Sequence, residues 1–181
     1  SSKEDSRAMN GNNILFSTNF KINEVIISDD SSDNTSRIVK EIAAANPSLS
    51  IRLLHHETRR GVSAAWNEIF REASGEIIVL YDADIIIDAD ATAHLVESMK
   101  GNIGLWASNP KPVLLKMSIV ASASRFVAHW LGSVRNERLS QYTVMGRALS
   151  ISSKAVKRIV IPENVIALDL YLQCKVLEQG F

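Results

Sequence analysis

The chain has 181 residues, of which 46% are hydrophobic and 22% charged, and its formal net charge is zero. This length is sufficient for one domain with a substantial core, and the balanced charge argues against a nucleic-acid-binding protein, which needs a basic surface. A single cysteine cannot form an internal disulfide, which is typical of a reducing compartment. No apolar run is long enough for a transmembrane helix, and the polar start does not resemble a signal peptide.

Strands and helices are expected to alternate along the first half of the chain. A polar segment at residues 1–13 precedes a single domain over residues 14–181. Apolar runs predict strands at residues 14–16, 25–27, 51–54 and 77–81. Amphipathic spacing predicts helices after residue 35, over 62–73 and near 91–100. This order predicts an α/β fold, with a mostly parallel sheet flanked by helices on both faces.

The second half has a less regular pattern. Strands are expected at residues 103–107 and 143–151, a short amphipathic segment at 155–160, and a last helix over 167–179 that Gly180 caps. Apolar residues recur at helical spacing over residues 113–134. A helix of this kind is usually part of the core, but it can also form a surface that contacts lipid or a partner.

Two carboxylates follow the most apolar strand. Asp82 and Asp84 come directly after residues 77–81, and no Lys or Arg lies between residues 76 and 90. The carboxyl ends of strands bind ligands in open α/β sheets, and carboxylate oxygens suit Mg²⁺ or Mn²⁺. The sequence therefore predicts a divalent cation at Asp82 and Asp84, with a polar helix-capping loop as the alternative. For Asp88 and Asp90, a position at the start of the next helix is the better interpretation.

Three more polar clusters lie at expected element ends. Asp29 and Asp30 follow a strand, and they either cap the next helix or bind a ligand. Arg60 and Gly61 precede a helix N-terminus, which favours anions, although a solvated basic turn is also possible. Asp169, within an apolar run, is either a partnered helix-start residue or a working carboxylate. The four histidines lack metal-ligand spacing and are expected to be structural or exposed.

In this order, the clusters resemble the inverting family 2 glycosyltransferases with a GT-A fold. Residues 28–35 closely resemble the strand-end pattern Asp-Asp-x-Ser-x-Asp-x-Thr, with Ser28 in place of the first Asp. Residues 61–67 fit a Gly-x-x-x-Ala-x-Asn turn and helix, and residues 73–84 fit Ala-x-Gly-Glu followed by a strand and Asp-x-Asp. Gly146 with Arg147, and residues 169–181, fit the later motifs. The resemblance covers about residues 24–181, and the family's first strand has no clear counterpart.

The resemblance implies roles for individual residues. Asp30 is expected to hydrogen-bond the nucleotide base, Asp84 to hold the metal, and Asp169 to act as general base. Asp82 supports the metal or contacts the ribose. The expected nucleotide-sugar contacts are Asp29, Asp30, Arg60, Gly61 and Asp82. Trp66 stands where the family often has Arg, and Leu168 where Glu is common.

The implied function is Mn²⁺- or Mg²⁺-dependent transfer of a sugar, with inversion, from a UDP- or GDP-linked donor to an acceptor hydroxyl. Residues 14–100 are expected to bind the donor, and residues 101–181 the acceptor, which is a glycan, a lipid-linked molecule or a protein. The expected location is cytoplasmic, with peripheral membrane association left open by residues 113–134. The alternatives are a non-catalytic binding domain of the same fold and a haloacid-dehalogenase-like phosphatase with Asp88 as nucleophile.

Overall fold

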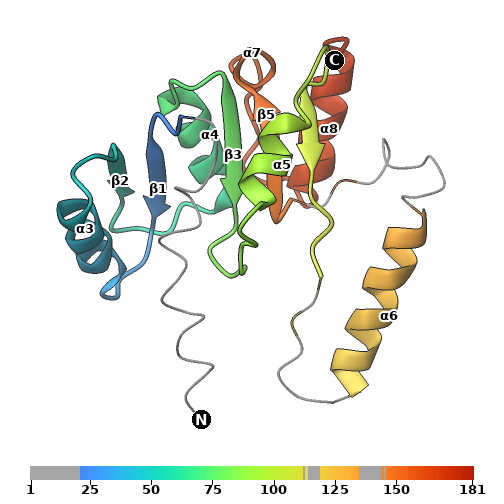
Figure 1. Ribbon diagram of the computed structural model, residues 1–181, viewed down its shortest axis with the longest axis horizontal. Coiled ribbons are helices and arrows are strands. Elements are labelled where there is room, and N and C mark those ends of the chain that lie inside the picture. The colour runs from blue at the N-terminus through green and yellow to red at the C-terminus, as the bar shows by residue number, and fades with distance from the viewer. Residues whose placement is uncertain (1–20, 112, 114–118, 135–143, 145) are drawn as a thin grey trace.

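A computed structural model describes residues 21–111, 113, 119–134, 144 and 146–181 (Figure 1). The polar segment at 1–13 and the expected strand at 14–16 lie outside these residues. The remaining expected strands and helices are all found, with ends shifted by a few residues. The α/β fold class with flanking helices is confirmed.

The first half forms a parallel strand pair with crossover helices. Strand β1 (Val25–Asp29) leads through α3 (Thr35–Ala45) to β2 (Ile51–His55), and α4 (Val62–Glu72) follows. The parallel register aligns Val25 with Ile51 and Asp29 with His55. A parallel pair requires a long connection, which α3 provides. The residues that follow β1 and β2 are consequently held together at one end of the pair.

The second sheet contains an antiparallel strand. Strand β3 (Ile77–Tyr81) is followed by α5 (Ala91–Glu97) and β4 (Leu105–Ala107), and β5 (Ala148–Ser152) lies between β3 and β4. Both of its pairings are antiparallel, whereas the sequence predicted a mostly parallel sheet. The difference arises because apolar runs indicate which residues form strands but carry no information about strand direction. The carboxyl end of β3 therefore lies beside the start of β5.

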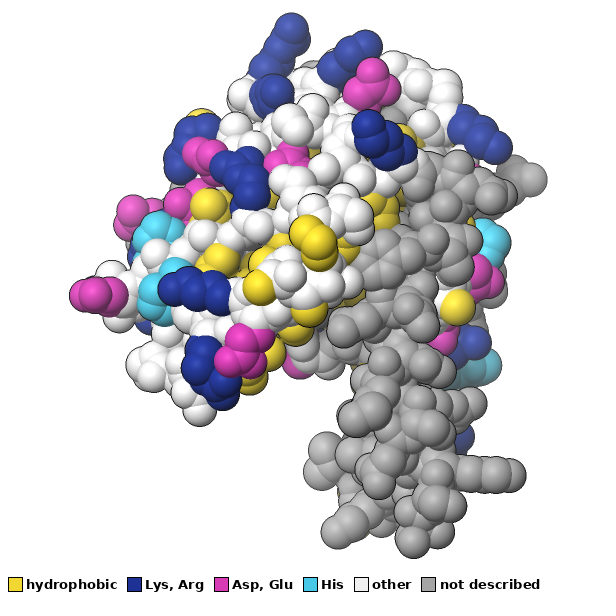
Figure 2. All heavy atoms as spheres, turned by 60° about the vertical axis from the view of Figure 1, so that its left-hand side comes forward, with side chains coloured by type: hydrophobic (Ala, Val, Ile, Leu, Met, Phe, Trp, Pro, Cys, Tyr) yellow, Lys and Arg dark blue, Asp and Glu magenta, His cyan; other side chains and the backbone are white. Residues whose placement is uncertain are grey.

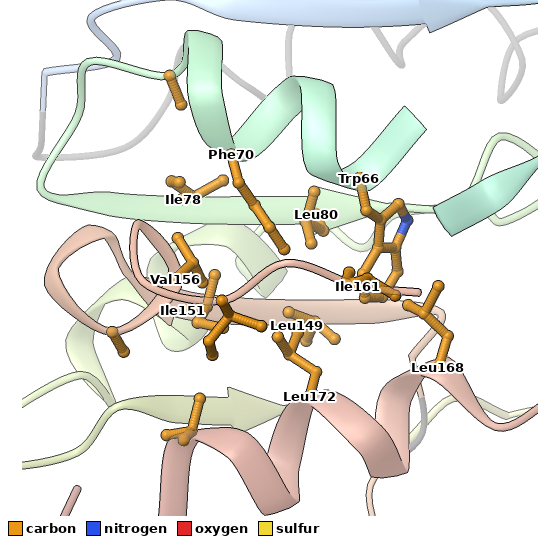
Figure 3. Packing of buried hydrophobic residues seen from close by; sticks show 14 residues of the cluster. Trp66, Phe70, Ile78, Leu80, Leu149, Ile151, Val156, Ile161, Leu168 and Leu172 are labelled. Atoms are coloured by element: carbon orange, nitrogen blue, oxygen red, sulfur yellow. The ribbon is translucent and has the colours of Figure 1, made fainter. Parts of the chain in front are cut away.

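The core lies between this sheet, α4 and the last helices, α7 (Ser153–Val156) and α8 (Leu168–Glu178). Leu149 and Ile151 of β5 and Leu172 of α8 are fully buried, and Figure 3 shows them facing one another. Burial of each such side chain contributes about 1.5–3 kcal/mol relative to exposure. The position of β5 is therefore fixed largely by hydrophobic packing on the face that carries Leu149 and Ile151.

Helix α6 (Ile119–Val134) differs from the other helices because its apolar side chains are exposed. Phe126 is 71% exposed and Trp130 56% exposed, and Figure 1 shows α6 standing apart from the sheet. The interpretation of this helix as core is therefore wrong for its described residues. Within the part of the chain that the structure describes, no helix has both the length and the apolar character needed to cross a bilayer.

Asn67 ties α4 to the segment that precedes α8. Its Nδ2 donates a hydrogen bond to the Ile161 carbonyl at 2.8 Å, and the Ile161 N–H donates to its Oδ1 at 2.9 Å. Both atoms of the side-chain amide are thus used by one backbone position, and the Ile161 side chain is buried in the core.

We expect Asn67→Ala to lower the free energy of unfolding by about 1–3 kcal/mol, because both polar groups of Ile161 lose their partner. Urea denaturation measures the change. Asn34→Ala is the control, since Asn34 precedes α3 without a side-chain capping bond, and we expect it to cost less than about 0.5 kcal/mol. Equal effects of the two substitutions would contradict the role of Asn67.

Candidate active site at the carboxyl ends of the strands

The pairing of β3 with β5 brings Arg147 to the carboxylates that follow β3. The Asp82 N–H donates to the Arg147 carbonyl at 2.9 Å, one residue beyond the pair formed by Tyr81 and Ala148. Arg147 Nη1 lies 3.0 Å from both carboxylate oxygens of Asp84 and 3.9 Å from Asp82 Oδ2. One guanidinium therefore faces both carboxylates of the predicted cation site.

Asp82 lies in a region where three carboxylates influence one another. Burial raises the pKa of Asp82, the positive charge of Arg147 opposes the shift, and the negative charges of Asp84 and Asp169 add to it. The Asp82 side chain is 39% exposed and that of Asp84 is 71% exposed. The three carboxylates predicted from separate parts of the sequence thus belong to one electrostatic cluster.

Asp169 lies in the first turn of α8 and is held by the backbone of Gly146. The Gly146 N–H donates to Asp169 Oδ2 at 3.0 Å. A Cβ atom on Gly146 would lie 3.0 Å from the Asp169 Cβ, closer than nearly all real contacts of this kind, so glycine permits this approach. The adjacent residues Gly146 and Arg147 therefore contact Asp169 and Asp84, respectively.

Asp82 and Asp84 are suited to a divalent cation that also coordinates phosphate groups of a ligand. Among the described residues, no group of three or more His, Cys, Asp or Glu side chains gathers as a metal site. Mg²⁺ is commonly bound by one or two carboxylates together with substrate phosphates and water. Asp82 and Asp84 fit that donor set, because both are carboxylates, both are accessible and they share one edge of the sheet.

The loop after Asp84 agrees with the helix-start interpretation of the next two acids. Asp90 occupies the N-cap position of α5 without a side-chain capping bond, and the Asp88 carbonyl accepts a hydrogen bond from the Ala91 N–H. Residues 85–87 form no strand, whereas the phosphatase alternative requires a strand directly before Asp88. The local structure therefore does not support Asp88 as a phosphatase nucleophile.

A second polar group at the end of β1 connects Asp30 with Arg60. The Arg60 N–H donates to Asp30 Oδ2 at 2.8 Å, and the Arg60 guanidinium contacts both Asp30 and Glu68. His56 Nε2 lies 3.0 Å from the same Glu68 carboxylate. Burial raises the pKa of Asp30, but hydrogen bonds from Arg60 outweigh this effect, and the net shift is downward. Arg60 is thus paired with two carboxylates. The next residue, Gly61, with φ of 85°, is the N-cap of α4.

Asp29 is buried at the end of β1 and is satisfied by several donors. Its Oδ1 accepts from the Ser31 N–H, its Oδ2 accepts from the Ser36 hydroxyl at 2.7 Å, and His55 Nδ1 lies 3.0 Å from the same oxygen. Hydrogen bonds from Ser31, Ser36 and His55 hold the pKa of Asp29 well below its usual range despite burial. Asp29 is thus a structural anchor for the loop that presents Asp30.

The two polar groups lie at the same edge of the molecule. Figure 1 shows the carboxyl ends of β1 and β3 pointing the same way, with the start of α8 beside them. Figure 2, turned toward the side with β2 and α3, shows acidic, basic and histidine side chains intermingled on that side. The strand-end edge combines the carboxylates of Asp30, Asp82 and Asp84 with the guanidinium groups of Arg60 and Arg147.

Sequence reasoning identified the carboxylates but not all of their partners. The sequence placed Arg147 only within a motif and indicated no role in the site for Glu68, His55 or His56. These contacts join residues on different elements, and Arg147 lies 63 positions from Asp84. No local spacing could have indicated them.

The α/β sheet with its flanking helices has the GT-A fold of solved glycosyltransferase structures. The chain belongs to glycosyl transferase family 2, whose family model matches residues 13–107, more than half of the chain. The matched range includes residues 14–16, where the sequence predicts a strand. A poly-β-1,6-N-acetyl-D-glucosamine synthase of Staphylococcus epidermidis is 36% identical over 89 residues, which cover 48% of this chain and 21% of that protein.

Solved structures show the same fold. The mannosyltransferase PcManGT from Pyrobaculum calidifontis, in complex with GDP-Man and Mn²⁺, superposes with a TM-score of 0.70 at 21% identity. The match covers all of this chain and 51% of PcManGT. TarS 1–349 from S. aureus in complex with UDP gives a TM-score of 0.58 at 19% identity, covering 95% of this chain and 51% of TarS. The chain thus spans about half the length of these structures.

The anchoring of Asp29 predicts an acid-dependent loss of stability. Its pKa is lower in the folded chain than in the unfolded chain, so the unfolded state binds more protons as the pH falls. The contribution is complete above the ordinary carboxyl pKa of 3.8 and decreases as the pH falls below that value.

We expect Asp29→Asn to lower stability at neutral pH by about 1–3 kcal/mol and to flatten the acid decline. Urea midpoints measured between about pH 7 and pH 3 test this expectation. The exposed Asp88→Asn variant is the control. A decline of equal steepness in wild type and Asp29→Asn would contradict the assignment.

Proposed function

We propose that this domain transfers a sugar from a nucleotide-diphosphate donor to an acceptor hydroxyl, with a divalent cation and with inversion at the anomeric carbon. The observation that carries the proposal is the gathering of Asp82, Asp84 and Asp169, from distant parts of the chain, at one edge of a GT-A fold. Family membership supports the reaction class, and the site residues support the mechanism.

The donor side uses the carboxylates that follow β3. Asp84 would hold Mn²⁺ or Mg²⁺, with Asp82 supporting it or contacting the ribose. When bound, the cation supplies positive charge that stabilises the departing diphosphate. The high exposure of Asp84 leaves its oxygens accessible to a cation, whereas the partial burial of Asp82 fixes its position beside β5.

The base of the donor is assigned to the end of β1. Asp30 would accept a hydrogen bond from the nucleobase, while Arg60 holds the carboxylate ionised and in place. Asp29 stabilises the loop from beneath, and Gly61 begins the adjacent helix. Structural neighbours contain GDP-Man in one case and UDP in another, so a UDP- or GDP-linked donor agrees with the fold. Residues 14–100 would bind the donor, and residues 101–181 the acceptor.

The acceptor side uses Asp169 as general base. Its carboxylate is held by the Gly146 N–H through one oxygen, and it lies close enough to Asp82 to affect the pKa of that residue. A carboxylate positioned in this way would take the proton of the acceptor hydroxyl as the oxygen attacks the anomeric carbon. Attack opposite the leaving diphosphate inverts the anomeric centre. The acceptor would be a glycan, a lipid-linked molecule or a protein.

We expect Asp84→Asn to abolish Mn²⁺-dependent binding of UDP and GDP, because the cation loses its main ligand. Asp169→Asn is expected to keep that binding and to reduce transfer at least about 100-fold, because the acceptor keeps its proton. Calorimetric titration measures binding, and release of nucleoside diphosphate from a panel of UDP- and GDP-sugars measures turnover.

Asp88→Asn is the matched control, since this exposed acid in the same loop has no assigned role, and both readouts should remain unchanged. Unaltered turnover in both Asp84→Asn and Asp169→Asn would refute the site assignment. Nucleotide binding without turnover in the wild type would support a non-catalytic binding domain instead.

Exposed apolar residues on α6 support a peripheral membrane contact. Residues 113–134 contain Lys116 and Arg125 but no Asp or Glu. Phe126 and Trp130 are largely exposed. A helix with exposed aromatic residues and only positive charge is suited to an interface with anionic lipid. We therefore propose that α6, within the acceptor half, rests on a membrane surface.

We expect the double variant Phe126→Ser, Trp130→Ser to bind anionic phosphatidylglycerol vesicles at least about tenfold more weakly than wild type, because two aromatic side chains no longer enter the interface. Vesicle flotation measures the binding. Val160→Ser, an exposed apolar residue outside α6, is the control. Absence of wild-type binding to these vesicles would exclude the membrane contact.

A further inference from the structure

We propose that the Arg147 guanidinium competes with the divalent ion for the carboxylates of Asp84 and Asp82. Once displaced by the ion, the guanidinium binds the diphosphate of the donor. The first step of this inference rests on the proposed cation at Asp84 and Asp82, and the second step rests on the proposed nucleotide-sugar donor. The first step concerns residues whose contacts are already described, and it can be measured with the metal alone.

The geometry of the guanidinium carries the first step. Arg147 Nη1 is equidistant from both oxygens of Asp84, at 3.0 Å, and is 3.9 Å from Asp82 Oδ2. A divalent ion held by Asp84 and Asp82 would use the same carboxylate oxygens that the Arg147 guanidinium contacts. The two positive charges would repel each other at this separation, so the guanidinium and the ion would compete for these oxygens.

The exposure of the pair makes the displacement feasible. The Arg147 side chain is 51% exposed and that of Asp84 is 71% exposed. An exposed ion pair of this kind contributes little to stability, because water and salt screen it. A divalent ion with twice the charge can therefore replace the guanidinium without unfolding the loop, while the Asp82–Arg147 backbone hydrogen bond keeps the two strands paired.

The released side chain remains at the donor side of the site. Its backbone carbonyl accepts the Asp82 N–H just before β5, so the guanidinium stays within reach of a ligand bound beside Asp82. A guanidinium presents two parallel N–H donors that match phosphate oxygens, and it remains charged at any physiological pH. Arg147 consequently exchanges a carboxylate partner for a phosphate partner as the donor binds.

The backbone next to Arg147 links the donor side of the site to the acceptor side. Gly146 donates its N–H to Asp169, the proposed base, and the following residue contacts Asp84. Gly146 and Arg147 therefore form a turn that contacts the donor-side and acceptor-side carboxylates at once.

We expect Arg147→Ala to bind Mn²⁺ alone about three- to tenfold more tightly than wild type, because the competing charge is gone. The same variant should bind UDP or GDP at saturating Mn²⁺ at least about tenfold more weakly, because a charged hydrogen-bond partner of the diphosphate is lost. The electron paramagnetic resonance signal of free Mn²⁺ measures the first quantity, and calorimetric titration the second.

Arg147→Lys keeps the charge and should restore Mn²⁺ affinity toward the wild-type value, while nucleotide binding remains weakened by the loss of the two-pronged donor geometry. Arg37→Ala, which removes an exposed arginine paired with Glu41 on α3, should change neither quantity. Circular dichroism and thermal unfolding establish that each variant is folded.

Unchanged or weaker Mn²⁺ binding by folded Arg147→Ala would overturn the competition. Unchanged nucleotide binding by this variant would overturn the phosphate contact. Tighter Mn²⁺ binding in a protein that binds neither UDP nor GDP, even as wild type, would support the competition while removing the proposed donor function. These outcomes therefore distinguish failure of the Arg147 competition from failure of the proposed donor function.

Discussion

The antiparallel pairing of β3 with β5 is the interaction on which the rest of the site depends. It aligns Tyr81 with Ala148, and the next hydrogen bond, from Asp82 to the Arg147 carbonyl, places the carboxylates beside the Gly146 turn. Leu149 and Ile151 of the same strand are fully buried. The hydrophobic packing that holds β5 in the sheet therefore also sets the distances between charged groups at its exposed end.

The core accommodates apolar residues at two positions where the family resemblance led us to expect charged ones. Trp66 and Leu168 are both buried in one apolar cluster (Figure 3). A charged side chain buried there would need a partner to offset its desolvation, so an apolar residue suits each position. Positive charge at this edge is instead provided by Arg60 and Arg147, each of which contacts carboxylates.

The two polar groups of the site differ in how rigidly their side chains are held. Asp29 and Asp30 are largely buried and accept several hydrogen bonds, so their geometry is set before any ligand arrives. Asp84 and Arg147 are exposed and joined by one ion pair that solvent weakens. One polar group is therefore rigid and the other adjustable, which would suit the proposed joint binding of a metal and a donor.

The sequence by itself determined the order of strands and helices, the α/β class and the carboxylates that end β1 and β3, because periodicity and strand-end acids are local features. The tertiary structure alone decided that β5 runs antiparallel, that α6 lies outside the core and that Arg147 meets Asp84. Strand direction, burial and long-range ion pairs depend on contacts between residues distant in the chain. Those contacts are settled only when the apolar faces of the whole domain pack against one another.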